Sequence, residues 1–151
     1  MLACDMAQEV PVLQPSDDAL EAMRALVSSG LPGVVIQDVR QGASFTIVPA
    51  SQVLRVMLPQ YVLDDAALAR VWDEESADTL ASGLAGHTVA DLLNALDRDD
   101  DEPSHTVDGD STMIEMAALM ADLRLPLVGV EDEGKLLGVV TVHELIGRLL
   151  G

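Results

Sequence analysis

The sequence is poor in aromatic residues and in cysteine. Its only aromatic side chains among 151 residues are Phe45, Tyr61 and Trp72, so a core has to be built from aliphatic residues and methionine. Cys4 is the only cysteine, which excludes an internal disulfide and fits a reducing compartment. The first ten residues contain no basic stretch and do not resemble a secretory signal, so we expect a cytoplasmic protein.

Positive charge is also scarce. Lys135 is the only lysine, and 8 basic residues face 26 acidic ones, for a formal net charge of −18. Phosphate backbones bind clustered Lys and Arg side chains, so this balance argues against nucleic acid or an anionic membrane surface as a partner. No apolar run approaches the roughly 18 residues that a membrane-spanning helix needs, and we predict no membrane insertion.

Motifs of catalysis and of metal binding are missing as well. The sequence has no P-loop, no nucleophile elbow and no glycine-rich dinucleotide fingerprint. His87, His105 and His143 are not spaced as metal ligands are, and we expect them on the surface or at helix caps. The sequence therefore predicts a protein that is not an enzyme and has no metal site.

What the sequence does contain is an internal repeat. Residues 13–38 align without a gap on residues 107–132, and matched positions carry the same type of residue. The matched pairs include Leu20 with Ile114, Pro32 with Pro126, Val34 with Val128, Ile36 with Val130 and, after a two-residue offset, Ile47 with Val139. We therefore predict two copies of one structural unit.

Each copy has the pattern of a β-α-β-β-α unit. A short extended segment leads to a helix that opens on capping residues, at 16–18 in the first copy and 110–112 in the second. Pro32 and Pro126 end these helices, and two fully apolar strands and a last helix follow. Strands of this kind are buried on both faces, which a single copy cannot achieve.

The expected fold is therefore α/β, with two β-α-β-β-α repeats packed face to face as a pseudo-twofold pair. We place the first repeat at residues 1–58, a connecting segment at 59–85 and the second repeat at 86–151. Within the connection and beyond it, the pattern predicts a helix over 64–80 and a charged loop over 97–103.

The run LPLVGVEDEGKLLGVVT, at residues 125–141, resembles the signature half of a cystathionine-β-synthase-type (CBS) repeat. The segment TVADLL at 88–93 is similar to the opening of such a repeat, and LPGVVI at 31–36 is a weaker match. The resemblance implies a tandem CBS pair that forms a homodimer and regulates a separate transporter or enzyme. It also implies a cleft for an adenosine ligand such as AMP, ATP or S-adenosylmethionine.

In the binding motif of this family, a Thr or Ser after an apolar strand is followed three residues later by Asp. Thr141 and Glu144 stand at these positions, and the resemblance adds Arg124 and Leu127 as further ligand contacts. Simpler interpretations stay open, because Thr141 suits a helix N-cap and Glu144 and Arg124 suit the two ends of helix dipoles.

The matching motif of the first copy is incomplete. Pro49 replaces the hydroxyl residue and Gln52 replaces the acid, which leaves Ser51 and Gln52 as its candidate contacts.

Two functions follow: a sensor of an adenosine compound, or a ligand-free dimeric module that docks on a transporter or enzyme. The acidic excess argues against a polyphosphate such as ATP, because phosphates need positive charge nearby.

Overall fold

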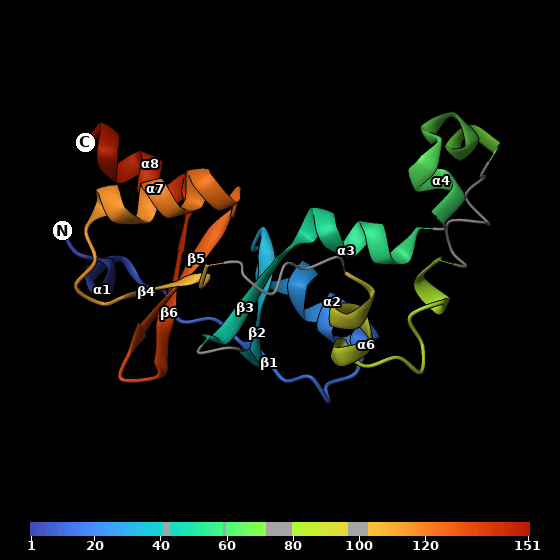
Figure 1. Ribbon diagram of the computed structural model, residues 1–151, viewed down its shortest axis with the longest axis horizontal. Helices are drawn as coiled ribbons and strands as arrows, with labels where there is room; N and C mark the ends of the chain where they lie inside the picture. Colours follow the sequence, from blue (N-terminus) through green and yellow to red (C-terminus); the bar gives the residue numbers. More distant parts are fainter. Residues whose placement is uncertain (41–42, 59, 72–79, 97–102) are drawn as a thin grey trace.

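The computed structural model describes the whole chain except residues 41–42, 59, 72–79 and 97–102. Figure 1 shows two similar halves side by side along the long axis, each with a three-stranded sheet flanked by helices. The first half contains β1 (Val12–Leu13), α2 (Ala19–Ser29), β2 (Gly33–Arg40), β3 (Ala43–Pro49) and α3 (Ala50–Met57). The second half contains β4 (Thr106–Asp108), α7 (Met113–Leu123), β5 (Leu127–Asp132), β6 (Lys135–Thr141) and α8 (Val142–Leu150). The remaining elements are α1 (Ala3–Met6), α4 (Gln60–Asp64), the 3-10 helix η1 (Ala66–Val71) and α6 (Val89–Ala95).

The two sheets share one topology and one register. Their strand orders are β1-β2-β3 and β4-β5-β6, and in each the first pair is parallel and the second antiparallel. Leu13 pairs with Ile36 in the first sheet, and the matched residues Val107 and Val130 pair in the second. The predicted α/β fold with two β-α-β-β-α repeats is therefore confirmed down to individual strand pairs.

Helices α2 and α7 begin and end at equivalent residues. Asp18 caps α2 and Thr112 caps α7, and each side chain accepts a hydrogen bond from the backbone N–H three residues on. Both helices end on a residue in the left-handed conformation, Gly30 after α2 and Arg124 after α7. The predicted starts are confirmed, and the two ends differ in a way that bears on function.

The two sheets meet in a shared apolar core. A Cβ added to Gly33 would lie 3.1 Å from Leu127 Cδ2, and these two residues open the equivalent strands β2 and β5. The pseudo-twofold axis therefore passes between them. The buried residues of this core come from both halves: Val35, Phe45, Ile47, Leu125, Leu127 and Val139. Each sheet thus shields the apolar face of the other, which a single repeat could not do.

The short helices α1 and α6 are exchanged between the halves. In the first half, the backbone N–H of Val89 in α6 donates to the carbonyl of Asp17 at 2.9 Å. In the second half, the N–H of Ala3 in α1 donates to the carbonyl of Ser111 at the same distance. Helix α6 therefore covers the first sheet although it precedes the second repeat in the sequence, and α1 covers the second sheet.

This exchange crosses the boundaries that we placed along the chain. The division into 1–58, 59–85 and 86–151 stays a prediction, while the packed halves take their covering helices from across it. The single helix predicted over 64–80 is wrong at its start, because α4 ends at Asp64 and η1 follows. Residues 72–79 of that predicted helix and most of the predicted loop at 97–103 lie outside the described residues, while Leu80 is helical as predicted.

One edge strand of each sheet forms hydrogen bonds with a residue from outside that sheet. At β6, Gln8 and Val139 exchange two backbone hydrogen bonds of 3.0 and 2.9 Å. A Cβ on Gly138 would overlap the backbone of Gln8, so the crossing requires glycine there. At the equivalent position of β3, the N–H of Ile47 donates to Nδ1 of His105 at 2.9 Å.

Within the described residues, every helix is too short or too polar to cross a bilayer.

Candidate functional site

The candidate ligand residues of the second half gather at one end of its sheet. Strand β5 begins where β6 ends, because Leu127 pairs with Thr141. The backbone N–H that opens α8 donates to the carbonyl of Pro126 at 3.0 Å. Arg124 lies two residues before that carbonyl, and Glu144 lies in the first turn of α8. The start of α8 and the turn that holds Arg124 are therefore neighbours.

Thr141 is the N-cap of α8. Its half-buried Oγ1 accepts the backbone N–H of Glu144 at 3.2 Å, which confirms the capping role. A threonine hydroxyl that accepts one hydrogen bond keeps its own hydrogen for a second partner. The Glu144 carboxylate lies 4.0 Å from the guanidinium of Arg148, a partly exposed pair of the kind that holds its members weakly. The hydroxyl of Thr141 and the carboxylate of Glu144 can therefore also contact a ligand.

Arg124 holds a backbone conformation that suits glycine better. Its φ is 55°, and the equivalent residue in the first half is Gly30 with φ 68°. The left-handed region costs a residue with a side chain roughly 1–2 kcal/mol. The Arg124 side chain is exposed, and in the described part of the chain it has no carboxylate within ion-pair distance. The position at the end of α7 also suits a charge that complements the helix dipole.

Leu127 is placed differently from the polar candidates. Its side chain is fully buried in the core shared by the two sheets, which leaves only its backbone at the end of the sheet. In the first half, Ser51 and Gln52 are exposed in the first turn of α3, at the equivalent end of that sheet. The N-cap of α3 is Pro49, which makes no side-chain hydrogen bond. This second group therefore lacks both the hydroxyl and the carboxylate.

The expectation that all three histidines lie on the surface or at caps is wrong for His105. Its exposed fraction is 9%, and it accepts the Ile47 N–H from the other half. The contact joins residues 58 positions apart, so the local sequence carried no signal for it. His87 and His143 are exposed as expected. Among the described residues, no three His, Cys, Asp or Glu side chains come together as metal ligands would.

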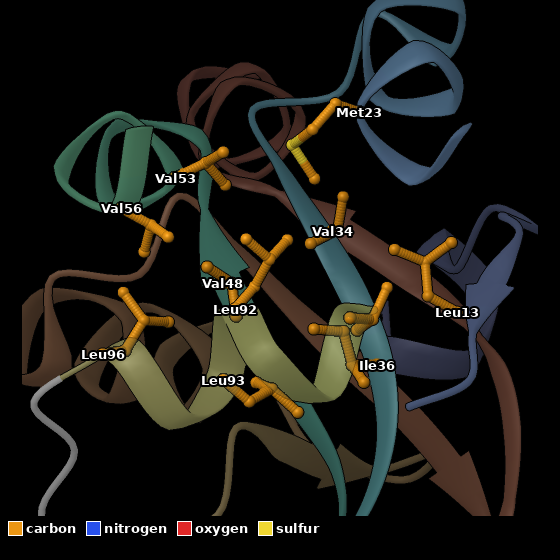
Figure 2. A pocket seen from close by; sticks show the side chains of 11 residues that line it. Leu13, Met23, Val34, Ile36, Val48, Val53, Val56, Leu92, Leu93 and Leu96 are labelled. Atoms are coloured by element: carbon orange, nitrogen blue, oxygen red, sulfur yellow. The ribbon is translucent and has the colours of Figure 1, made fainter. Parts of the chain in front are cut away.

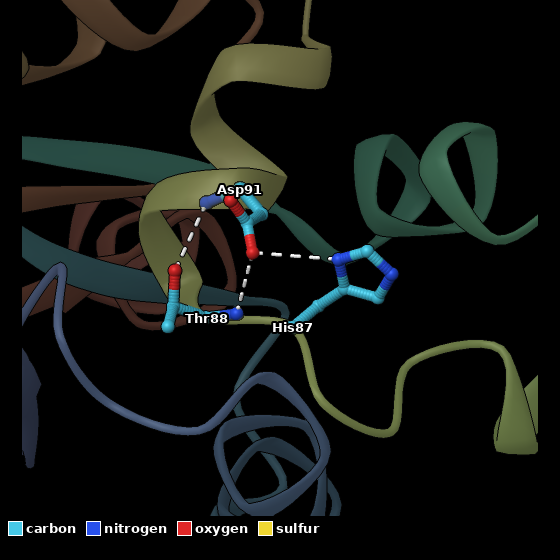
Figure 3. Close-up of polar contacts among 3 residues, drawn as sticks. All are labelled: His87, Thr88 and Asp91. Carbon is cyan, nitrogen blue, oxygen red and sulfur yellow. Dashed lines mark hydrogen bonds and ion pairs between the residues drawn. The ribbon is translucent and has the colours of Figure 1, made fainter.

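Figure 3 shows the capping box that opens α6. The hydrogen bond from the Thr88 backbone N–H lowers the pKa of Asp91 below its ordinary value of 3.8. Desolvation opposes this shift, and His87, whose Nδ1 lies 3.3 Å from the carboxylate, adds to it. This box caps the exchanged helix beside its backbone contact with Asp17, and it is separate from the ligand candidates.

Two hollows differ in what they can hold. The cavity in Figure 2 lies between the first sheet and helices α2, α3 and α6, is wholly apolar and measures about 10 Å³. That volume is about one water, far below the several hundred Å³ of a nucleotide pocket. A groove of about 590 Å³ runs along α8, beside Met1 and the first residue of α7. It is lined by Met1, Met113, His143, Glu144, Gly147, Arg148 and Gly151.

Comparison with known proteins identifies the family. A model of the CBS domain matches residues 100–151. A CBS domain-containing protein of unknown function from Kribbella flavida DSM 17836 is 40% identical, with a TM-score of 0.76 over 100% of this chain and 99% of that one. CBSX2, a CBS-pair protein of Arabidopsis thaliana, was solved in complex with AMP; it is 19% identical, with a TM-score of 0.62 over 99% of this chain and 96% of that one. A hexameric CBS-CP12 protein from bloom-forming cyanobacteria is 17% identical, with a TM-score of 0.62 over 98% of this chain and 71% of that one.

No curated protein sequence matches the chain. The family model covers the second half alone, whereas the Kribbella flavida protein is similar over the whole length. The matched register of the two sheets agrees with that likeness over both halves. This chain therefore belongs to the CBS domain family and is built as a pair of CBS repeats.

Proposed function

We propose that this chain is a non-enzymatic, cytoplasmic regulatory module that binds an adenosine compound in its second half and controls a partner protein. The observation that carries the proposal is the conformation of Arg124. An exposed arginine without a carboxylate partner in the described part of the chain stands where the first half uses Gly30. Glycine would adopt this left-handed backbone conformation at a lower free-energy cost. We therefore infer that the arginine is present for what its side chain binds.

The neighbouring groups suit the parts of an adenosine compound. A guanidinium binds phosphate through paired N–H donors, so Arg124 would hold the phosphate. The N-terminus of α8 adds backbone N–H groups, and the hydroxyl of Thr141 can donate as well. A carboxylate accepts two hydrogen bonds from a diol, so Glu144 would hold the ribose. The complex of CBSX2 with AMP supports this class of ligand in a protein of the same fold.

The charge of the chain narrows the choice of ligand. A net charge of −18, and the pairing of the nearby Arg148 with Glu144, disfavour a polyphosphate such as ATP. AMP carries less negative charge, and S-adenosylmethionine is cationic. We therefore expect AMP or S-adenosylmethionine to bind more tightly than ATP.

Self-association is part of the proposed function. Exposed apolar side chains lie on α7 and α8, with Ile114, Ile146 and Leu150 between 50% and 82% exposed. Patches of this kind mark protein contact sites. The hexameric CBS-CP12 protein shows that a relative of the same fold assembles. We propose a homodimer, which docks on a separate transporter or enzyme.

The first test is a thermal-shift and calorimetry series with AMP, S-adenosylmethionine and ATP. A ligand at 100 times its dissociation constant should stabilise the chain by about 2.7 kcal/mol. Arg124→Gly should keep or raise the melting temperature of the free chain, because it removes backbone strain, and should abolish the shift with AMP. Gln52→Ala, at the position of the first half that matches Glu144, should leave the shift unchanged.

A second variant separates capping from binding. Thr141→Asp keeps a good N-cap for α8 but places a negative charge where the phosphate would lie. We expect a folded chain that no longer binds AMP. Absence of any shift with all three compounds would overturn the sensor. The incomplete motif at Pro49 and Gln52 then favours the alternative, a ligand-free dimer that docks on a transporter or enzyme.

A further inference from the structure

The edge strands β3 and β6 are held from outside their own sheets by two different kinds of acceptor. At β6, the N–H of Val139 donates to the backbone carbonyl of Gln8 at 2.9 Å. At β3, the N–H of the matched residue Ile47 donates to the ring atom Nδ1 of His105, also at 2.9 Å. A backbone carbonyl accepts hydrogen bonds at every ordinary pH, whereas an imidazole ring that is fully protonated accepts none. The two halves therefore differ in whether a proton can break the contact.

His105 joins the two halves of the chain. Its backbone belongs to the second half, because its carbonyl accepts the N–H of Gly129 in β5 at 3.0 Å. A Cβ added to Gly129 would lie 2.7 Å from Cγ2 of Thr106, so β4 lies close against β5 directly after His105. The side chain of His105 instead contacts β3 of the first half. The ring is thus held by one sheet and binds the edge of the other.

This contact is buried on both sides. Ile47 is 2% exposed and His105 is 9% exposed, so water has little access to replace the hydrogen bond. A buried backbone donor needs an acceptor. Loss of that acceptor should shift the equilibrium by about 5- to 150-fold toward an open form, in which the Ile47 N–H no longer contacts the ring.

The ring can accept the Ile47 N–H only while Nδ1 carries no hydrogen. The neutral ring meets this requirement when its one hydrogen is on Nε2. The imidazolium ion has a hydrogen on each nitrogen, so Nδ1 would point a donor at the donor of Ile47. The ring can therefore take up a second proton only when the contact with β3 is broken. Acid favours the open form, because that form alone binds the extra proton.

The charged groups on the strands around the ring are mostly carboxylates. Asp38 of β2 accepts a hydrogen bond from Thr46 of β3 at 3.3 Å, and Glu131 of β5 accepts one from Thr106 of β4 at 2.9 Å. The other charged residues of these strands and of β6 stand at strand ends: Arg40, Asp108, Asp132 and Lys135. Residues 97–102, which precede this segment and carry further charges, lie outside the described residues. Negative charge attracts a cation, so Asp38 and Glu131 favour uptake of the proton once the contact is broken.

We propose that the hydrogen bond between His105 and Ile47 is a pH-sensitive switch, which releases β3 from the second half when the His105 ring takes up a proton. The change is confined to one edge, because β6 keeps its contact with the carbonyl of Gln8. Acid therefore alters the first half and leaves the second half, with the proposed ligand site, in place. The switch does not depend on an adenosine ligand, and the free chain is enough to test it.

Amide hydrogen exchange of the full chain, followed by NMR, tests the switch. Between about pH 7.5 and pH 5.5, histidine titrates while carboxyl groups ordinarily stay ionised. After correction for the intrinsic pH dependence of exchange, protection of the Ile47 amide should fall by about fivefold or more on acidification. Protection of the Val139 amide should not change. Unchanged protection at Ile47, or an equal loss at both amides, would overturn the proposal.

His105→Asn is the matched control variant. It places an oxygen as many bonds from Cα as Nδ1 is, and this oxygen accepts a hydrogen bond at both pH values. The Ile47 amide should then be equally protected at both, although His87 and His143 still titrate. Loss of protection in this variant on acidification would assign the effect to another group and overturn the switch.

The ring itself gives a test that needs no variant. Nitrogen-15 chemical shifts of the His105 ring in the natural chain show which nitrogen carries the hydrogen. At about pH 7.5 we expect Nε2 to be protonated and Nδ1 to be the acceptor. A hydrogen on Nδ1 at that pH would overturn the proposal, whatever the behaviour of the variant.

Discussion

The two halves share one backbone plan but differ in packing and in binding groups. Val34 and Val48 of the first half are 8% and 5% exposed, whereas their counterparts Val128 and Val140 are fully buried. A cause lies in the helices, since α2 presents Ala22 where α7 presents Met116. A cavity of about 20 Å³ borders Ala22 as a result.

The half that packs less tightly also differs at the residues that match the proposed site. The first half ends α2 with Gly30, which the left-handed backbone conformation favours, and begins α3 after Pro49, which makes no side-chain cap. The second half caps α8 with Thr141 and ends α7 with Arg124, and of these two only Arg124 goes against the backbone preference. The comparison teaches that a duplicated unit can keep its fold through strand register while the residues at the equivalent ends of its two sheets diverge.

The largest expected effect comes from making the second half resemble the first. Met116→Ala would remove a side chain with no exposed surface and should lower the free energy of unfolding by about 2–5 kcal/mol. Urea titration would measure it. Met116→Leu, which nearly conserves volume, should cost less than about 1.5 kcal/mol. Equal costs for the two variants would mean that packing of Met116 does not distinguish the halves.

The link between the halves should have a smaller effect. His105→Ala leaves the buried N–H of Ile47 without its acceptor, which should cost about 1–3 kcal/mol. Amide hydrogen exchange would show faster exchange at Ile47, while the amide of Val139 at the edge of the other sheet stays protected by Gln8. His105→Gln offers a side-chain oxygen and should restore part of the protection. Unchanged exchange at Ile47 in His105→Ala would contradict this role.

The smallest effect concerns the cap of the exchanged helix in the first half. Because folding lowers the pKa of Asp91, its carboxylate stabilises the folded chain above pH 3.8, and this contribution is lost as the pH falls through the lowered value. The melting temperature of the natural chain should therefore exceed that of Asp91→Asn at neutral pH, and the gap should close in acid below pH 3.8. A gap in melting temperature that stays constant down to about pH 2.5, roughly one unit below the ordinary pKa of 3.8, would show that the charge of Asp91 does not affect stability.

Much of the fold was predictable because the same sequence pattern occurs in both halves, so each half supports the interpretation of the other. The caps at Asp18 and Thr112 and the stops before Pro32 and Pro126 are local signals, and local signals survive in the structure. The helix over 64–80 was wrong at its start, because apolar spacing alone cannot tell an α-helix from the short 3-10 helix η1. For the site, the sequence suggested Thr141, Glu144 and Arg124; the repeat alignment pairs Arg124 with Gly30, but only the structure showed that both adopt the left-handed conformation.

Sequence alone determined the β-α-β-β-α order, the duplication and the acidic surface, since these depend on residue type and spacing along the chain. Only the tertiary structure decided that α1 and α6 change places, that Gln8 crosses β6 over Gly138, and that His105 caps β3. Contacts of this kind join segments far apart in the chain. They exist because each edge strand needs partners for its backbone groups, and the nearest ones come from the other half.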